Sequence, residues 1–256
     1  MIILASAKGQ DFTPAATMPS STLPEFLDQV HQLITLLRHY SLSDLRILMH
    51  ASQGLAEQTL TQIHSFSLSC TPENSKPAIL AFSGEAYRSL AAIDWTQEDL
   101  TFAQDHVRIL SGLYGSLRPL DLMQPYRLEM GTSLSNERGK TLYPFWSDLV
   151  TASLNRAMAM ERHPILINLA SNEYAKVVQI NRLHSPWLDI QFMEETNGRL
   201  KSVAVYAKRA RGLMAGFCIR NRIEHPEDLR HFTGNGYAFR PDLSNEYQWL
   251  FTRPMD

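Results

Sequence analysis

The strongest chemical signal in this sequence is a group of cations between residues 207 and 222. The stretch contains no acidic residue and five basic ones: Lys208, Arg209, Arg211, Arg220 and Arg222. If it forms a helix, Lys208, Arg211 and Arg222 share the face opposite an apolar stripe, with small residues in between. A basic surface of this kind lets a phosphate backbone approach closely. The alternative is a solvated helix whose arginines pair with acidic side chains elsewhere.

A second stretch, between residues 110 and 130, combines glycines with charged and hydroxyl side chains. Gly112 and Gly115 could free backbone N–H groups for an anion. The polar side chains of the stretch are Tyr114, Arg118, Asp121, Tyr126, Arg127 and Glu129. The Gly-Lys-Ser/Thr ending of a P-loop is absent, and so is a dinucleotide-binding fingerprint. The stretch is therefore either an anion-binding loop or a rigid loop closed by Arg–Glu and Arg–Asp pairs.

Several common catalytic and metal sites can be excluded from the residue patterns. The nine histidines form no HExxH or HxH pair and no cluster with cysteine, so we expect no metal site, and direct iron binding is disfavoured. No GxSxG nucleophile elbow is present. Cys70 and Cys218 lie far apart in the chain, which favours two free thiols over a redox sensor. No cofactor is indicated.

The composition is typical of one globular domain, which we expect to span residues 1–256. Of the 256 residues, 44% are hydrophobic and 20% are charged. A net charge of -2 excludes histone-like binding of nucleic acid but permits a local basic cleft. The sequence has no stretch of about 18 uninterrupted apolar residues and no signal peptide. We therefore expect a cytoplasmic protein without a membrane span.

Hydrophobic periodicity and turn signals predict the elements that must position these residues. Strands are expected near 2–6, 78–82, 108–110, 165–169, 236–240 and 247–252. Helices are expected from a capping box at residues 22–25 to residue 37, and at 96–106, 144–160 and 207–222. Asn197-Gly198 predicts a hairpin between strands near 188–193 and 200–206. Residues 111–143 carry scattered glycines and prolines and are predicted to form an extended, structured loop region.

Two short helices near 43–50 and 54–66, joined by a tight turn, could present backbone N–H groups to a phosphate. Simple helix packing is an equally good explanation of this pattern. Because strands and helices are mixed without strict alternation, we expect an α+β (mixed α/β) fold with a central mixed sheet surrounded by helices.

Several long motifs together resemble the YaaA family of bacterial proteins. They are LSGLYGSLRPLDLMQPYRLEMG (110–131), GKTLYPFW (139–146), NLASNEYAKVV (168–178) and YAKRARGLMAGFCIRNRIEHPEDL (206–229). The resemblance covers nearly the whole chain. The sequence departs from the family pattern at Ser6-Ala7-Lys8, where a Ser-Pro-Ala-Lys is shortened, at Gly216, where a basic residue is common, and at Asn235, where a glutamate is usual.

The resemblance implies a role in peroxide stress and in limiting damage from intracellular iron. It also implies a DNA-binding protein with a positively charged cleft and a helix-hairpin-helix, in a fold peculiar to the family. In this chain the helix-hairpin-helix would correspond to residues 43–66. The cleft would include Lys208, Arg209 and Arg211.

The first functional hypothesis is a DNA-binding protein of the peroxide-stress response, without enzymatic activity, that protects DNA or assists its repair. Binding to duplex or branched DNA would be directed mainly at the backbone, because no base-reading module is recognisable. The residues expected to contact DNA, or another anion, are Lys8, Arg118, Arg127, Lys176, Lys208, Arg209, Arg211 and Arg222.

The second hypothesis is an enzyme or receptor for a small anionic substrate that is phosphorylated, carboxylated or nucleotide-like. Its candidate residues mix cations, hydroxyls and a carboxylate: Ser6, Lys8, Tyr126, Arg127, Glu129, Lys176, Lys208 and Arg211. If Lys8, Lys176 and Lys208 converge, repulsion between their charges would lower the pKa of at least one of them and permit base chemistry. A deep pocket would favour this hypothesis over DNA, whereas dispersal over the surface would remove it.

Overall fold

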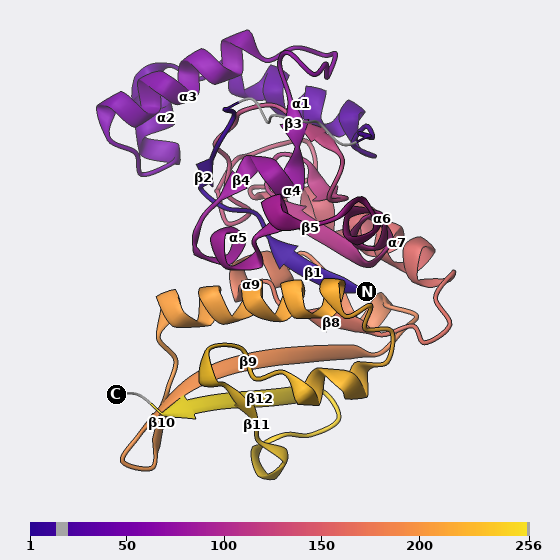
Figure 1. The fold of residues 1–256 in the computed structure, drawn as a ribbon. Coiled ribbons are helices and arrows are strands. Elements are labelled where there is room, and N and C mark those ends of the chain that lie inside the picture. Colours follow the sequence, from indigo (N-terminus) through magenta and orange to yellow (C-terminus); the bar gives the residue numbers. More distant parts are fainter. Residues whose placement is uncertain (14–19, 255–256) are drawn as a thin grey trace.

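The computed structural model describes residues 1–13 and 20–254, and within these ranges the chain forms a mixed eight-stranded sheet flanked by helices (Figure 1). The strands of this sheet are β1 (Ile2–Ala5), β5 (Val107–Ser111), β6 (Gly115–Leu117), β8 (Leu166–Asn168), β9 (Trp187–Thr196), β10 (Arg199–Lys201), β11 (Ala238–Phe239) and β12 (Gln248–Pro254). They follow the order β11-β12-β9-β8-β1-β5-β6, and β10 pairs with β9. The predicted fold class, with a central mixed sheet surrounded by helices, is confirmed.

The centre of the sheet is parallel. β1 pairs with β5 and β8, and β9 pairs with β8 and β12, all in parallel register. The strands β6, β10 and β11 are antiparallel additions. Parallel strands covered on both faces read as apolar runs, as Ile2–Ala5 does. Numbered along the chain, the parallel strands lie in the order 2-1-3-4-5, so the direction of the connections reverses between β1 and β8.

The described helices are α1 (Leu27–Leu37), α2 (Leu42–Leu48), α3 (Gln53–Ser65), α4 (Ala78–Ala81), α5 (Glu85–Leu90), α6 (Gln97–His106), α7 (Leu142–Met158), α8 (Asn172–Ala175) and α9 (Ala204–Arg220). Short 3-10 turns occupy Ala92–Asp94, Ile180–Arg182, Pro226–His231, Gly234–Gly236 and Pro241–Leu243. Helix α9 contacts both β9 and α5. None of the helices in the described part of the chain is long and apolar enough to cross a bilayer.

The predicted pair of short helices is present as α2 and α3, joined by a short turn. Ser41 and Asp44 form a capping box at the start of α2, and Ser52 precedes α3 as its N-cap residue. Figure 1 places both helices at the end of the molecule farthest from β11 and β12. The pair therefore has a surface of its own, away from the parallel centre of the sheet.

Two predicted elements are wrong. The apolar run 78–82 is helix α4, set between the short strands β3 (Lys76–Pro77) and β4 (Phe82–Ser83), because a run of this length does not distinguish strand from helix. β3 pairs with β7 (Leu122–Met123), and β4 pairs with β2 (Gly9–Gln10). The first helix begins at Leu27 and has no capping box.

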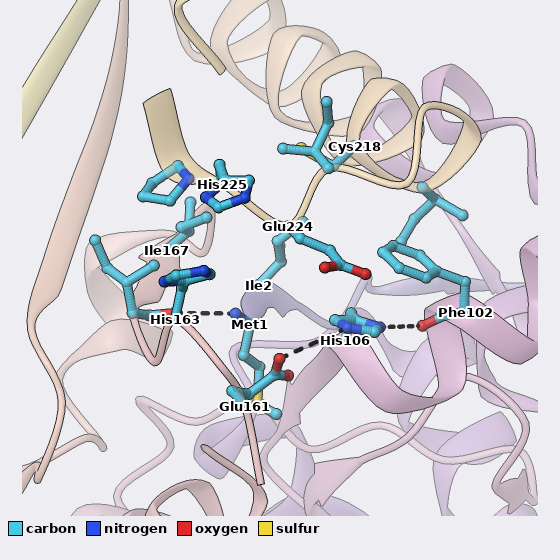
Figure 2. Close-up of a pocket in the computed structure, with 14 residues that line it drawn as sticks. Met1, Ile2, Phe102, His106, Glu161, His163, Ile167, Cys218, Glu224 and His225 are labelled. Atoms are coloured by element: carbon cyan, nitrogen blue, oxygen red, sulfur yellow. Dashed lines mark hydrogen bonds and ion pairs between the residues drawn. The ribbon is translucent and has the colours of Figure 1, made fainter. Parts of the chain in front are cut away.

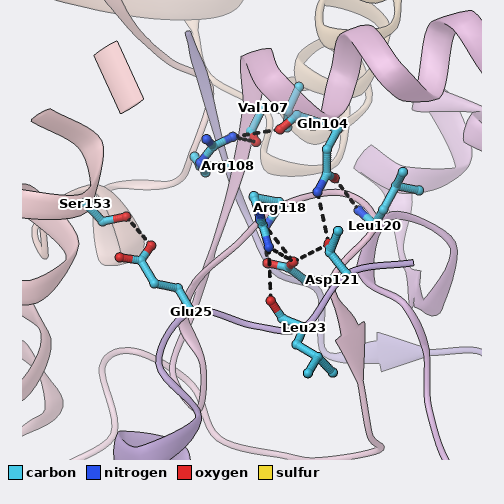
Figure 3. A network of polar contacts seen from close by, with 10 residues as sticks. Leu23, Glu25, Gln104, Val107, Arg108, Arg118, Leu120, Asp121 and Ser153 are labelled. Carbon is cyan, nitrogen blue, oxygen red and sulfur yellow. Dashed lines mark hydrogen bonds and ion pairs between the residues drawn. The ribbon is translucent and has the colours of Figure 1, made fainter. Parts of the chain in front are cut away.

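Thr22, the predicted helix cap, instead binds the buried carboxylate of Asp121. The Thr22 hydroxyl donates to Asp121 Oδ1 at 2.6 Å. The same oxygen accepts from Arg118 Nη2 at 2.9 Å, and the Arg118 backbone amide donates to Oδ2 at 2.8 Å (Figure 3). Gln104 bridges Thr22 and the Leu120 amide. This network fixes the middle of the predicted loop region 111–143, which contains the short strands β6 and β7.

Trp146 of α7 fixes the first part of the same region. Its indole Nε1 donates to the carbonyl of Gly112 at 2.9 Å. Gly115 has a φ of 67°, and a Cβ at this position would lie 2.5 Å from the Trp146 ring. A glycine is therefore required both by the backbone conformation and by the space that the ring leaves.

Candidate functional site

A pocket of about 290 Å³ lies at the carboxyl ends of β1 and β8, where the direction of the strand connections reverses. We call it the switch-point pocket. Its charged lining residues are Lys8, Glu85, Glu129, Glu173, Lys208 and Arg211. Ser6, Tyr87 and Tyr174 contribute hydroxyl groups. In open sheets with helices on both faces, ligands bind in the crevice at this reversal, so the position alone marks the pocket as a candidate site.

The lining residues come from segments far apart in the chain. Residues 6–9 follow β1, residues 83–87 lead into α5, and residues 171–174 follow β8. Helix α9 adds Lys208 and Arg211. The topology therefore gathers into one pocket groups that the sequence separates by more than 200 residues.

Gly212 allows α9 to lie close enough to contribute. A Cβ at this position would lie 1.9 Å from the carbonyl oxygen of Ala86 in α5, which no side chain tolerates. The small residues that the sequence places between the cations of α9 thus bring this helix against α5. They do not form an open surface for a phosphate backbone.

Arg211 is a mostly buried cation whose Nε has no hydrogen-bond partner among the described residues. Burial lowers the pKa of its guanidinium, and the negative charge of Asp189 on β9 opposes this effect. Asp189 accepts hydrogen bonds from Asn168 at 2.7 Å and Gln191 at 3.0 Å. A guanidinium stays charged in proteins, so Arg211 brings a fixed positive charge to the pocket.

The carboxylates of the pocket are already bound to donors within the protein. Glu129 pairs with Lys8 at 2.9 Å and with Arg127 at 3.7 Å. Glu85 pairs with Arg88 and Arg209, and these bonds lower the pKa of its carboxyl group. Glu173 accepts from the Gly131 amide at 2.9 Å. Together the lining residues and their partners comprise three carboxylates and six cations, so the site favours an anion.

Hydroxyl groups form the floor of the pocket. The Tyr87 hydroxyl donates to the carbonyl of Ala5 at 2.9 Å. Ser6 and Tyr174 also line the pocket, and the phenol of Tyr126 lies 2.7 Å from Ser111 Oγ. Burial raises the pKa of Tyr174 to about 12 and that of Tyr126 further still. Both phenols therefore stay protonated at neutral pH and can donate hydrogen bonds.

The residues of the small-anion hypothesis largely converge. Ser6, Lys8, Glu129 and Lys208 line the pocket together with Arg211. Tyr126 and Arg127 do not line it, although Arg127 pairs with Glu129, which does. Lys176 is exposed and does not line the pocket, so the predicted convergence of three lysines is reduced to Lys8 and Lys208.

The remaining cations proposed for DNA are engaged elsewhere. Arg118 binds Asp121, Arg209 binds Glu85, and Arg222 binds Asp99. The Arg–Glu and Arg–Asp pairs that close a rigid loop are thus present at Arg127–Glu129 and Arg118–Asp121. These pairs leave Lys208 and Arg211 as the cations of α9 that face the pocket.

Sequence reasoning missed Tyr87, Tyr174 and Asp189. Tyr174 falls within the motif NLASNEYAKVV, and Tyr87 lies in the stretch AFSGEAYRSL (81–90), but neither stretch has a spacing that predicts chemistry. Asp189 lies beside Asn168 only because β8 and β9 pair in this register. The strand pairing, which the sequence leaves open, is the missing information in each case.

The structure shows what surrounds two of the positions that depart from the family pattern, Gly216 and Asn235. A Cβ at Gly216 would lie 2.9 Å from the Arg220 guanidinium and 3.1 Å from the Leu90 carbonyl, so Arg220 occupies the space beside this position. Asn235 adopts a left-handed conformation with a φ of 56°, and its carbonyl accepts from Arg253. The third, at residues 6–8, lies in the switch-point pocket.

A second cavity, at the amino end of β1, is too small for an organic ligand. It has a volume of about 30 Å³ and is surrounded by His106, Glu161, His163, Glu224 and His225, among others (Figure 2). The N-terminal amine of the chain donates to the carbonyl of Ile165 beside it. In the described part of the chain, no group of His, Cys, Asp or Glu side chains is arranged to hold a metal ion.

Neither cysteine has the environment of a reactive thiol. Both are free; Cys218 is buried, and burial raises the pKa of its thiol to about 12. Burial also raises the pKa of Cys70, against the effect of a contact with Gln124. Because the thiolate is the reactive form, both thiols are poorly suited to sensing peroxide.

Comparison with known proteins places the chain in a family. A family model described as "Peroxide stress protein YaaA" matches residues 1–243. A UPF0246 protein of Tolumonas auensis is 45% identical over 256 residues, covering 100% of this chain and 98% of the relative. UPF0246 proteins of Azoarcus sp. and Ralstonia nicotianae are 44% and 46% identical over 260 and 253 residues, covering 100% and 99% of this chain and 100% and 98% of the relatives. The chain belongs to the YaaA family of peroxide stress proteins.

Proposed function

We propose that this protein acts in the response to peroxide stress by binding a small anionic ligand in the switch-point pocket. The observation that carries this proposal is Arg211, a mostly buried cation with an unused Nε that lines the pocket beside Lys208. Arg211 forms no salt bridge within the described residues, and an anionic ligand in the pocket would supply the counter-charge. The family's description as a peroxide stress protein supports the physiological part of the proposal.

The size of the pocket favours a small molecule over a DNA backbone. Its volume of about 290 Å³ is close to the lower limit of about 300 Å³ for small-molecule sites. The cations that would have to follow a DNA strand are instead paired with carboxylates, as Arg118, Arg209 and Arg222 are. The pocket also contains an acidic and a basic group, Glu129 and Lys8. These two groups could transfer protons to or from a bound small molecule, so the site is also compatible with catalysis.

The first experiment is thermal unfolding in the presence of inorganic phosphate, a nucleoside monophosphate and the corresponding nucleoside, at constant ionic strength. A ligand that binds only the folded state raises Tm, and at a given concentration the rise is larger for tighter binding. We expect the phosphorylated compounds to raise Tm and the nucleoside alone to have little effect. No shift with any anion would contradict the proposal.

Matched variants locate the binding. Arg211→Gln and Lys208→Gln should reduce the ligand-induced rise in Tm, whereas Arg182→Gln should not, because Arg182 pairs with Asp148 outside the pocket. Lys208 is exposed, so its replacement tests the site without disturbing the core. In a strain that lacks the gene, Arg182→Gln should restore growth in hydrogen peroxide and Lys208→Gln should not.

DNA binding is the second candidate, and the observation that favours it is the helix pair α2–α3. Ser52 makes no side-chain bond to the first amides of α3, and a Cβ at Gly54 meets nothing within 4 Å. The first turn of this 13-residue helix is therefore open to a phosphate. Arg46 and Ile47 are exposed on the neighbouring α2.

Fluorescence anisotropy with duplex and branched DNA across a salt series tests this candidate. Binding to phosphates should weaken steeply with salt. Arg46→Ala should weaken binding to all sequences alike, while Lys208→Gln should have no effect if the helix pair is the DNA site. If instead only Lys208→Gln weakened DNA binding, DNA would reach the switch-point pocket.

A further inference from the structure

Two of the three carboxylates that line the switch-point pocket are balanced by cations of the protein itself. Each of the two forms salt bridges with two basic side chains, which are Arg88 and Arg209 for Glu85, and Lys8 and Arg127 for Glu129. A carboxylate that already faces two cations has little negative charge left to offer to a ligand.

Glu173 is the carboxylate of the pocket that lacks a basic partner. It lines the pocket but forms no salt bridge within residues 1–13 and 20–254. Its Oε1 accepts from the backbone amide of Gly131 at 2.9 Å, whereas its Oε2 accepts no hydrogen bond from the described residues. The segment that follows β8 therefore brings to the pocket an unbalanced negative charge and a free acceptor oxygen.

Neutral groups hold Glu173 in place without using its charge. The residue lies in the first turn of α8, and its backbone carbonyl accepts from the Tyr143 hydroxyl at 2.8 Å. A Cβ at Gly131 would lie 3.0 Å from Glu173 Oε1, so the glycine leaves the space that this carboxylate occupies. The position of the carboxylate is thus fixed while its charge remains available.

Helix α9 brings two cations to the same pocket that are also unbalanced. Lys208 and Arg211 form no salt bridge with Glu173 or with any other acid in the described part of the chain. The negative charge of Asp189 acts on Arg211 from outside the pocket lining, but the hydrogen bonds of this carboxylate come from two neutral amides. Charges of both signs therefore line one pocket without neutralising each other.

We propose that the ligand of the switch-point pocket is a zwitterion, with its anionic group at Arg211 and Lys208 and an ammonium group at Glu173. This inference rests on the proposed function and narrows its ligand class. A ligand with both charges gives each unbalanced side chain a partner, whereas a plain anion leaves Glu173 unpaired and is repelled by it. Leu4 and Leu169 offer apolar surface to the carbon chain between the two groups.

The test compares amino phosphates with alkyl phosphates of equal length by isothermal titration calorimetry at constant ionic strength and pH about 7, where an alkyl ammonium group is charged. Phosphoethanolamine is paired with propyl phosphate, and aminopropyl phosphate with butyl phosphate. Within each pair an ammonium group replaces a terminal methyl group. We expect the amino phosphate of the better-fitting length to bind about fivefold more tightly than its alkyl counterpart. If neither amino phosphate exceeds its counterpart, the inference is overturned.

Variants assign the two charges to their side chains. Glu173→Gln keeps an acceptor for the Gly131 amide and removes the charge, so it should bind the amino and alkyl phosphates about equally well. Arg211→Gln should weaken both compounds and leave the ratio of their affinities unchanged. Glu137→Gln is the matched control, because Glu137 is exposed and lies outside the pocket lining, and it should bind as the wild type does. A preference for the amine that survives in Glu173→Gln would refute the inference.

The outcomes separate this inference from the proposed function. If none of the four compounds binds the wild type, the proposed function fails, and the zwitterion assignment fails with it. If the alkyl phosphates bind as tightly as the amino phosphates, the pocket takes plain anions, and only the zwitterion assignment fails. The wild-type comparison needs no variant, so it decides the question even if Glu173→Gln does not fold.

Discussion

At the scale of single residues, glycines decide whether the cations of α9 reach the pocket. Gly212→Ala would place a methyl group 1.9 Å from the Ala86 carbonyl, so α9 and α5 must separate. We expect the free energy of unfolding to fall by about 1–3 kcal/mol, the usual cost of overpacking. Urea denaturation measures the loss, and anion binding should weaken with it.

Gly54→Ala is the matched control for this substitution. Gly54 lies in α3, where an added Cβ has open space, so alanine should stabilise the helix by about 0.5–1 kcal/mol. If both variants were equally destabilised, the close approach of α9 and α5 would not be the cause of the stability lost in Gly212→Ala.

The reactivity of each thiol also depends on the burial of that single residue. Because burial raises the pKa of Cys218 to about 12 and also raises that of Cys70, little thiolate is present at neutral pH. We expect both thiols to react with hydrogen peroxide more slowly in the folded protein than in urea, as measured by the loss of free thiols. A faster reaction of the folded protein would point instead to a peroxide-sensing cysteine.

At the scale of elements, the strands β9 and β12 are joined by a buried carboxylate. Glu194 is 1% exposed and accepts from Tyr237 and, at 2.6 Å, from Arg253. Glu194→Gln would leave the Arg253 guanidinium without a counter-charge and should lower the free energy of unfolding by about 3–5 kcal/mol. Its neighbour Glu195 is partly exposed and pairs with Arg240, so Glu195→Gln should cost less than about 1 kcal/mol.

Element types were largely predictable from the sequence, because periodicity and capping are local. The helices at 97–106 and 204–220 and the Asn197-Gly198 hairpin follow such local signals. The run 78–82 was mispredicted because five apolar residues fit either a strand or a helical turn. Thr22 has the pattern of a helix cap, but a partner 99 residues away, Asp121, takes its hydroxyl group.

The candidate site was predictable only in part, because local sequence signals do not contain the contacts between distant segments that assemble it. Its residue types were found within the motifs, but the distinction between Arg211, which faces the pocket, and Arg222, which binds Asp99, depends on tertiary packing. The pocket lining also required the pairing of β1 with its neighbours, because Ser6 and Tyr174 come together only at the ends of β1 and β8. Local patterns in a single sequence do not predict long-range pairing of this kind.

At the scale of the whole molecule, ion pairs between distant segments make stability depend on pH. Asp99, at the start of α6, binds Arg222 beyond the end of α9, and this hydrogen bond lowers the pKa of its carboxyl group. A carboxyl group whose folded pKa is lowered contributes stability that is fully present above its ordinary pKa and is lost as pH falls through the folded value.

Asp99→Asn should therefore be less stable than the wild type at pH about 7, and the difference should shrink as pH falls below about 4 and through the lowered folded pKa, where the wild-type carboxylate becomes protonated as well. Thermal unfolding by circular dichroism, from pH about 7 to below the folded pKa, measures the difference. Asp94→Asn is the control, because Asp94 is exposed nearby and forms no salt bridge within the described residues. A gap between Asp99→Asn and the wild type that stays constant down to the lowest pH would mean that the stability does not come from the charge pair that links α6 to the end of α9.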